Sequence, residues 1–142
     1  MFSKEESKRL RQEFWISFGK SFPRKWILYD TKIKGLTLKF HFELKKAMVS
    51  LDIDHSDLGV RIELWDKLLS LESIVKNDYL PEVIFNDSLI LDNGKEISRA
   101  YVALTDVSIH NKNTWRDTME FLNDNMLLLE AFFMDYRQIL EN

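Results

Sequence analysis

Apolar side chains recur along this chain with two different periods, and these periods predict its secondary structure. Near the N-terminus, Leu10, Phe14 and Phe18 follow one another at the four-residue spacing of a helix. Ser3 begins a Ser-x-x-Glu capping box, so this helix is expected to start there. Pro23 cannot continue a helix and is expected to end it.

The next part of the chain alternates apolar and polar residues, which is the two-residue period of a half-buried strand. Residues 36–42 and 49–53 each show this alternation. A tight turn near Lys45-Lys46 is expected to join them as a hairpin. The short, bulky apolar segment 26–29 predicts a further strand ahead of this hairpin.

A second helix is predicted after this hairpin, because apolar residues return there to the helical period. Ser56 or Asp57 can cap its N-terminus, and the pattern weakens near Asn77-Asp78. The buried face of this helix is expected to consist of Leu58, Ile62, Trp65, Leu68, Leu69 and Leu71.

A second hairpin and a long last helix are predicted in the remainder of the chain. Asn93-Gly94 favours a type I′ hairpin turn, because both central positions of that turn need positive φ, and segments 83–91 and 96–104 flank it as strands. A broad apolar stripe then predicts a helix over about residues 114–140. The stripe is wide enough to supply core and also a homodimer seam through this C-terminal helix, and core alone is the simpler interpretation.

The predicted fold class is α+β, with the order α-β-β-β-α-β-β-α in a single domain spanning residues 1–142. Hairpin connections imply a mostly antiparallel sheet of about five strands with three helices packed on it.

Only 4 Gly and 2 Pro leave little room for linkers. The absence of cysteine excludes disulfides, thiolate metal sites and cysteine nucleophiles, and fits a cytoplasmic protein. No segment approaches the roughly 18 apolar residues of a membrane helix, so no membrane partner is expected.

The charge is divided unevenly along the chain. Residues 1–46 carry 12 Lys+Arg against 5 Asp+Glu, and residues 47–142 carry 8 against 18. The formal net charge is −3, which argues against unselective coating of DNA but leaves room for a local basic face.

The excess positive charge concentrates in the loop and hairpin 24–46, next to Trp26 and Tyr29. Lys39 and His41 share one face of their predicted strand. Positive charges beside aromatic rings can follow a phosphate backbone while the bases stack. The alternative is that these lysines solubilise an outer sheet face or pair with acidic residues elsewhere. The candidate contacts to nucleic acid or to an acidic protein are Arg24, Lys25, Lys32, Lys34, Lys39, Lys45 and Lys46.

Glu43-Leu44-Lys45 has the Glu-x-Lys form of a metal-dependent nuclease site. In such sites carboxylates hold Mg²⁺ and the lysine helps to place or activate water. With Asp30 as a second ligand, Asp30, Glu43 and Lys45 are the alternative catalytic residues, and the predicted order resembles the restriction-endonuclease-like core. The motif falls at a turn, however, which favours an ordinary solvated turn.

Asp52 and Asp54 share one strand face and are the alternative metal ligands, although a polar outer face is the simpler interpretation.

Other signatures of chemistry are missing from the sequence. The three histidines do not have zinc-hydrolase spacing, and there is no nucleophile elbow, Walker A or dinucleotide-binding motif. Arg99 either points inward and needs a carboxylate partner or points outward. The four tryptophans either line a pocket for a small ligand or, more simply, build the core. They are Trp15, Trp26, Trp65 and Trp115.

Several stretches together resemble an uncharacterised bacterial family, a domain of unknown function of about 140 residues. They are Arg11-Gln12-Glu13-Phe14-Trp15 with Phe18, Trp26 with Tyr29-Asp30-Thr31, Ile97-Ser98-Arg99-Ala100-Tyr101, Asn113 with Trp115, Phe121-Leu122, Met126, Leu129-Glu130 and Phe132-Phe133. The resemblance implies an association with DNA or defence, because members of that family often lie C-terminal to a predicted nuclease-like segment. It implies no catalytic residue in this chain.

The sequence therefore favours a non-enzymatic binding or assembly module without a cofactor. In this interpretation the basic hairpin 24–46 contacts nucleic acid or another anionic partner, and the C-terminal helix forms a homodimer. The alternative is a metal-dependent phosphodiesterase with a nuclease-like core, which would require Mg²⁺.

Overall fold

The first helix begins at the capping box that the sequence predicts. In the computed structural model, which describes residues 2–142, the Glu6 backbone N–H donates to Ser3 Oγ at 3.1 Å. The Ser3 backbone N–H donates to Glu6 Oε1 at 3.4 Å. Helix α1 spans Lys4–Ser21 and ends just before Pro23. Its buried residues are Leu10, Phe14 and Phe18.

Both predicted hairpins are present, and together they form one antiparallel sheet. The predicted type I′ turn is wrong, because Gly94 has a positive φ but Asn93 does not. The strands are β1 (Leu36–Phe42), β2 (Lys46–Ile53), β3 (Ile84–Ile90) and β4 (Glu96–Thr105). Their order in the sheet is β1-β2-β4-β3, so the two hairpins join through β2 and β4, and β1 is an edge strand. All three strand pairs are antiparallel.

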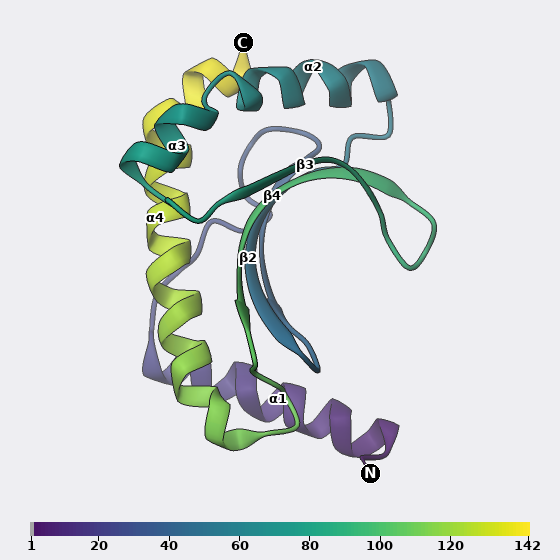
Figure 1. Ribbon diagram of the computed structural model, residues 1–142, viewed down its shortest axis with the longest axis vertical. Coiled ribbons are helices and arrows are strands. Elements are labelled where there is room, and N and C mark those ends of the chain that lie inside the picture. The colour runs from purple at the N-terminus through teal and green to yellow at the C-terminus, as the bar shows by residue number, and fades with distance from the viewer. Residues whose placement is uncertain (1) are drawn as a thin grey trace.

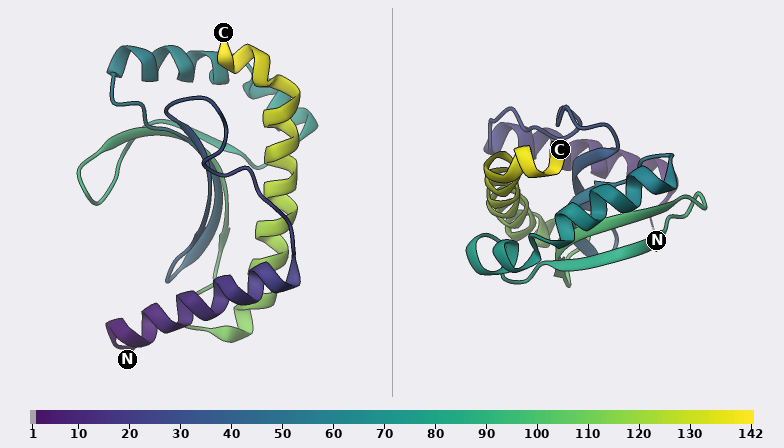
Figure 2. Two further views of the ribbon diagram at one scale, coloured as in Figure 1. Left: turned by 180° about the vertical axis from the view of Figure 1, so that it is seen from behind. Right: turned by 90° about the horizontal axis from the view of Figure 1, so that it is seen from above.

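The helices lie on the convex side of this strongly curved sheet (Figure 1). The remaining helical elements are α2 (Leu58–Leu69), α3 (Glu72–Asp78), a short 3₁₀ segment η1 (Lys112–Thr114) and α4 (Trp115–Glu141). Helix α4 runs along the convex side, α2 and α3 lie at one end of it, and α1 lies at the other (Figures 1 and 2). The concave side opens away from α4.

The two-residue period of the strands decides which side chains meet the helices. Leu38 on β1 and Val49 and Leu51 on β2 are buried in the hydrophobic core, to which α4 contributes Leu122, Met126, Leu129 and Phe133. The apolar stripe of α4 therefore supplies a large part of the core. Exposed apolar side chains remain on α4 at Leu127, Leu128, Met134 and Ile139.

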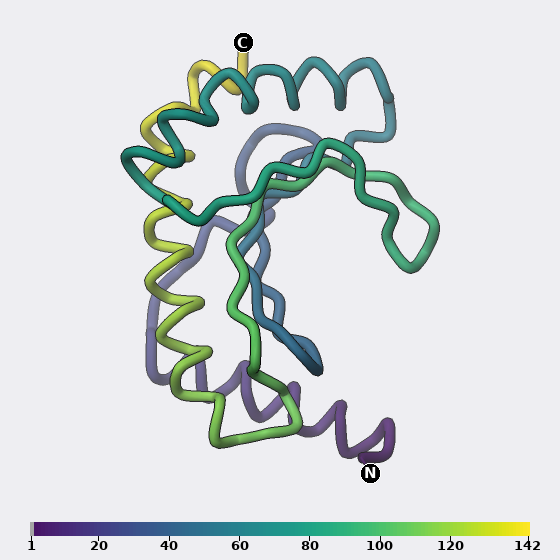
Figure 3. Tube along the Cα trace, viewed as in Figure 1, coloured from purple at the N-terminus to yellow at the C-terminus, as the bar shows by residue number. Residues whose placement is uncertain are grey.

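The prediction of five strands is wrong at residues 26–29, which form an irregular loop between α1 and β1 (Figure 3). Leu28 adopts a φ of 45°, in the left-handed region, and this conformation interrupts an extended strand. A backbone hydrogen bond joins this segment to the sheet, in which the Leu38 N–H donates to the Leu28 carbonyl at 3.1 Å. The order α-β-β-β-α-β that resembles a restriction-endonuclease-like core therefore lacks its first strand.

The predicted second helix is divided into α2 and α3, so the structure has four α-helices where the sequence predicts three. Its buried face also differs from the prediction, because Leu58, Ile62 and Leu69 are exposed. Arg61 takes a buried position on α2 instead, where its Nη1 and Nη2 donate to the backbone carbonyl and the carboxylate of Glu96, both at 2.8 Å. The face of α2 that is buried is therefore not the face that its apolar residues predict.

Within residues 2–142, no helix combines the length and apolar character needed to cross a lipid bilayer.

Gly35, just before β1, and Gly94, in the turn between β3 and β4, together test how closely the backbone at Gly35 approaches His55. Both have a φ of +85°, but a Cβ at Gly35 would lie 2.6 Å from His55 Cβ, whereas a Cβ at Gly94 meets nothing within 4 Å. We expect Gly94→Ala to lower the free energy of unfolding by about 1 kcal/mol through backbone strain alone, and Gly35→Ala to lower it by about 3 kcal/mol. Urea denaturation measures both values, and equal losses would show that His55 moves aside freely.

Candidate functional site

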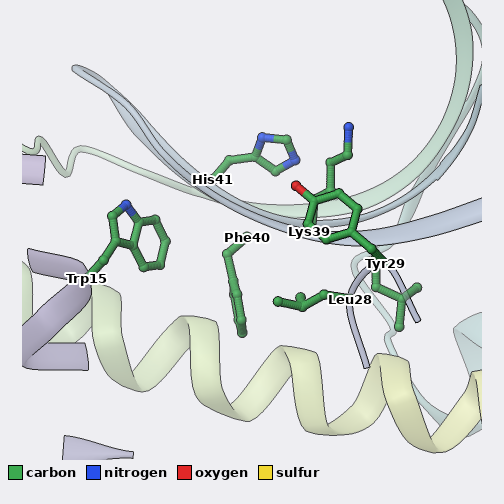
Figure 4. Close-up of a pocket in the computed structure, with 7 residues that line it drawn as sticks. Trp15, Leu28, Tyr29, Lys39, Phe40 and His41 are labelled. Carbon is green, nitrogen blue, oxygen red and sulfur yellow. The ribbon is translucent and has the colours of Figure 1, made fainter. Parts of the chain in front are cut away.

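A surface cleft of about 310 Å³ lies at the free edge of the sheet, along β1. Figure 4 shows Lys39 and His41 projecting from one side of β1 and Phe40 from the other, with Trp15 and Tyr29 flanking the strand. The predicted pairing of Lys39 and His41 on one strand face is therefore confirmed. The lining residues are Trp15, Leu28, Tyr29, Leu38, Lys39, Phe40 and His41.

Tyr29 is presented to solvent by a strained turn. Its side chain is 73% exposed, which is unusual for so large a ring. The preceding residue, Leu28, has the positive φ described above, and the Asp30 N–H closes the turn on the Ile27 carbonyl at 2.8 Å. A left-handed leucine stores strain, and strain of this kind concentrates at functional positions.

A buried carboxylate on α4 holds this loop in place. Glu130 is 3% exposed and accepts hydrogen bonds from Arg24 Nη2 at 3.0 Å and from the Ile27 backbone N–H at 2.6 Å. Arg24 also stacks over the Trp26 ring, 5.1 Å from its centroid. Arg24, a predicted nucleic-acid contact, is therefore engaged in anchoring the loop to the core.

Helix α1 extends the cleft with a second basic wall. Lys8, Arg11, Gln12, Trp15 and Ile16 line an adjoining cleft of about 730 Å³, which shares Trp15 with the first. Within residues 2–142, no Asp or Glu is among the residues lining either cleft. We call the two clefts together the β1 groove.

The α1 part of the β1 groove is absent from the sequence-based list of candidates. The spacing of Lys8, Arg11 and Trp15 was nevertheless a usable signal, because residues three, four and seven apart share one face of a helix. That face is distinct from the buried face of Leu10 and Phe14.

Behind the groove, the concave side of the sheet contains a buried ion-pair cluster. Asp52 is fully buried and accepts from Arg99 Nε at 2.8 Å and from Arg99 Nη2 at 2.9 Å. Lys39 Nζ lies 3.6 Å from Asp52 Oδ2. Burial alone would raise the pKa of Asp52, but the hydrogen bonds and charge of Arg99 outweigh it, so this pKa lies below its usual value. The structure thus places Arg99 inward, with the carboxylate partner that such an orientation requires.

His41 borders this cluster as a neutral residue. Its Nε2 lies 2.8 Å from Ser50 Oγ. Burial, assisted by the charge of Arg99, lowers the pKa of His41 to about 4, although Asp52 acts in the opposite direction. Ser50 is fully buried, so this Ser–His pair is closed to a substrate.

The other predicted basic contacts occupy different environments. Lys32 pairs with Asp30 at 2.7 Å, and the exposed Lys32 ammonium lowers the pKa of the Asp30 carboxyl. Lys25, Lys34 and Lys45 are exposed, Lys46 begins β2, and none of the four has an ion-pair partner within residues 2–142. Of the seven predicted contacts, only Lys39 lines the β1 groove.

The alternative catalytic residues are not brought together. Asp30 lies beside the start of β1, because its neighbour Leu28 bonds to Leu38, whereas Glu43 and Lys45 occupy the exposed turn beyond the end of β1. Leu38 and Glu43 are separated by roughly 16 Å of extended strand. Within residues 2–142, no three His, Cys, Asp or Glu side chains cluster closely enough to hold a metal.

The alternative metal ligands Asp52 and Asp54 are each engaged by basic side chains. Asp52 is occupied by Arg99, and Asp54 lies 3.7 Å from Lys95 Nζ. Both carboxylates are therefore neutralised by the protein itself. The interpretation of Asp52 as part of a polar outer face is wrong, because Asp52 is fully buried.

The four tryptophans do not line one common pocket. Trp65 and Trp115 are buried in the core, and Trp26 is half-buried against Phe40. Only Trp15 lines the β1 groove.

Comparison with known proteins identifies similarity to one family. The model of a family described as "Domain of unknown function (DUF4268)" matches residues 10–137. No curated protein and no solved structure matches the chain. The match accounts for most of the sequence, including α1 from residue 10 onward, the loop, strands β1 to β4 and nearly all of α4.

The depressed pKa of His41 predicts a pH dependence of stability. Between pH 6.5 and about 4 the unfolded chain binds a proton at this position that the folded protein does not accept. Stability should therefore fall as the pH falls through this window, by on the order of 3 kcal/mol. His41→Gln should flatten this part of the profile of unfolding free energy against pH. Above pH 7 the two profiles should run parallel, and an unchanged slope in the variant would contradict the assignment.

Proposed function

This chain belongs to the family described as a domain of unknown function (DUF4268), and from its geometry we propose that it is a binding module that holds single-stranded nucleic acid in the β1 groove. The observation that carries this proposal is the lining of the groove. Lys8, Arg11 and Lys39 supply positive charge, and Trp15 and Tyr29 supply aromatic surface, without a carboxylate among the described lining residues.

The two kinds of side chain correspond to the two parts of a nucleotide. Lysine and arginine neutralise phosphates, and each neutralised phosphate releases counterions, which makes binding dependent on salt. An exposed ring such as Tyr29 offers a stacking surface that accepts any base. Bases in a duplex are already stacked, so an isolated exposed ring favours a single strand.

The proposed activity is binding without chemistry. The Ser50–His41 pair is closed to substrates, and Asp52 and Asp54 are engaged by Arg99 and Lys95. The groove retains a net positive charge even though the whole chain has a formal net charge of −3. Nucleic acid is therefore expected to bind at this groove and not over the whole protein surface.

A second candidate function, self-association through α4, is favoured by one observation. Leu127 and Met134 are seven residues apart, so they share one face of α4, and both are exposed, with Leu128 beside them. We propose this face as the seam of a homodimer. Such a dimer would leave β1, at the edge of the sheet, accessible.

Two arginines on α1 give a matched test of nucleic-acid binding. Arg11 lines the groove, whereas Arg9 is exposed about 200° away around the helix. We expect Arg11→Glu to weaken binding of a fluorescein-labelled oligothymidine of about 12 nucleotides at least tenfold, and Arg9→Glu to change it little. Fluorescence anisotropy at low salt measures both.

Tyr29→Ala should weaken the same complex by about 1–3 kcal/mol through the lost stacking. Equal effects of Arg9→Glu and Arg11→Glu would indicate unspecific attraction and contradict a defined groove. Binding of an acidic peptide but not of the oligonucleotide would replace nucleic acid by an acidic protein as the partner.

The α4 seam predicts a concentration-dependent dimer. Met134→Glu should shift the mass measured by light scattering from dimer to monomer, because a buried unpaired carboxylate opposes association. Ile90→Glu is the control, since Ile90 is also exposed, at 63%, but lies on β3. A strictly monomeric wild-type protein at high concentration would contradict the seam.

A further inference from the structure

The ion-pair cluster behind the groove has one more positive than negative charge. Arg99 engages both carboxylate oxygens of Asp52, and Lys39 lies 3.6 Å from Oδ2. His41 is neutral at physiological pH and adds no charge. Two cations therefore share one anion at a position where Asp52 is fully buried and Arg99 is 8% exposed. The excess charge is that of the partly exposed Lys39, and beside a buried pair it attracts an anion more strongly than it would in open water.

One hydrogen-bond donor remains free on this face. Within residues 2–142, Arg99 Nη1 makes no hydrogen bond, whereas the unpartnered Thr37 Oγ1 is buried. Thr37 faces Asp52 directly in the β1–β2 register, so it belongs to the same cluster. Lys39 is 29% exposed in its side chain, and its distance from Asp52 is longer than a direct hydrogen bond. Its ammonium can therefore turn toward a ligand.

Lys39 connects this cluster to the groove, because it also lines the cleft beside Tyr29 (Figure 4). We infer that Lys39 and Arg99 form a seat for one backbone phosphodiester of a single strand, while the adjoining base stacks on Tyr29. This inference rests on the proposed function and assigns its central phosphate contact. A phosphodiester carries a single negative charge, which matches the single excess positive charge of the cluster.

Asp52 has a positioning role in this seat. By holding Arg99 through two hydrogen bonds, it fixes the guanidinium before the ligand arrives. An arginine that is already ordered loses little side-chain entropy on binding. Lys39 provides the adjustable contact, and Arg99 provides the fixed one.

The test compares the salt dependence of oligothymidine binding in variants of two lysines. Lys39→Met removes the seat's adjustable charge, and Lys34→Met removes an exposed lysine that does not line the groove. The logarithm of the binding constant falls with the logarithm of the salt concentration. Loss of one phosphate contact in Lys39→Met should make this slope shallower by about 0.7. Lys34→Met should retain the wild-type slope, and Lys39→Arg should restore it. Tyr29→Ala should lower affinity without changing the slope.

The outcomes separate the seat from the proposed function. If the wild-type protein does not bind the oligonucleotide, the proposed function fails and the seat fails with it. If the wild type binds but Lys39→Met and Lys34→Met have the same slope, the seat alone is overturned. A measurement on the wild-type protein covers the case in which Lys39→Met does not fold. The side-chain Nε–H resonance of Arg99 should shift on titration with oligothymidine, and an unmoved resonance overturns the seat.

Discussion

The bidentate pair between Asp52 and Arg99 fixes the centre of this fold. The two residues face each other on β2 and β4, the strands through which the two hairpins join into one sheet. A slip of one residue in this register would send a charged side chain to the opposite, apolar face. Removing one partner of a buried pair costs about 3–5 kcal/mol, because the other charge is left without compensation. The pair therefore specifies the register on which both faces of the sheet depend.

That register separates two kinds of surface. The convex face carries Leu38, Val49 and Leu51 into the core, and the concave face carries Lys39, Ser50 and Asp52. Because α4 covers only the convex side, the polar face is not packed beneath this helix. Ser50 and Asp52 are nevertheless removed from water, which is why the charges there are paired and why His41 stays neutral.

The groove at the edge of β1 is assembled from segments that are far apart in the sequence. Glu130, near the middle of α4, holds the loop that presents Tyr29, and α1 brings Arg11 to the same edge through Trp15. Each contribution depends on a contact with another element, so the groove forms only when the chain is folded.

The sequence by itself determined the class of this fold and most of its elements. Alternation predicted β1 and the first hairpin, Asn93-Gly94 predicted the second, the capping box placed the start of α1, and the stripe of α4 predicted a long helix, because these signals are local. Tertiary structure decided what depends on distant contacts. Leu28 in a left-handed conformation turned the expected strand 26–29 into a loop, and Glu130 engaged Arg24, so one predicted ligand contact became an anchor. The pairing of β2 with β4 placed the buried Asp52 opposite Arg99, and no local period in either strand predicts that contact.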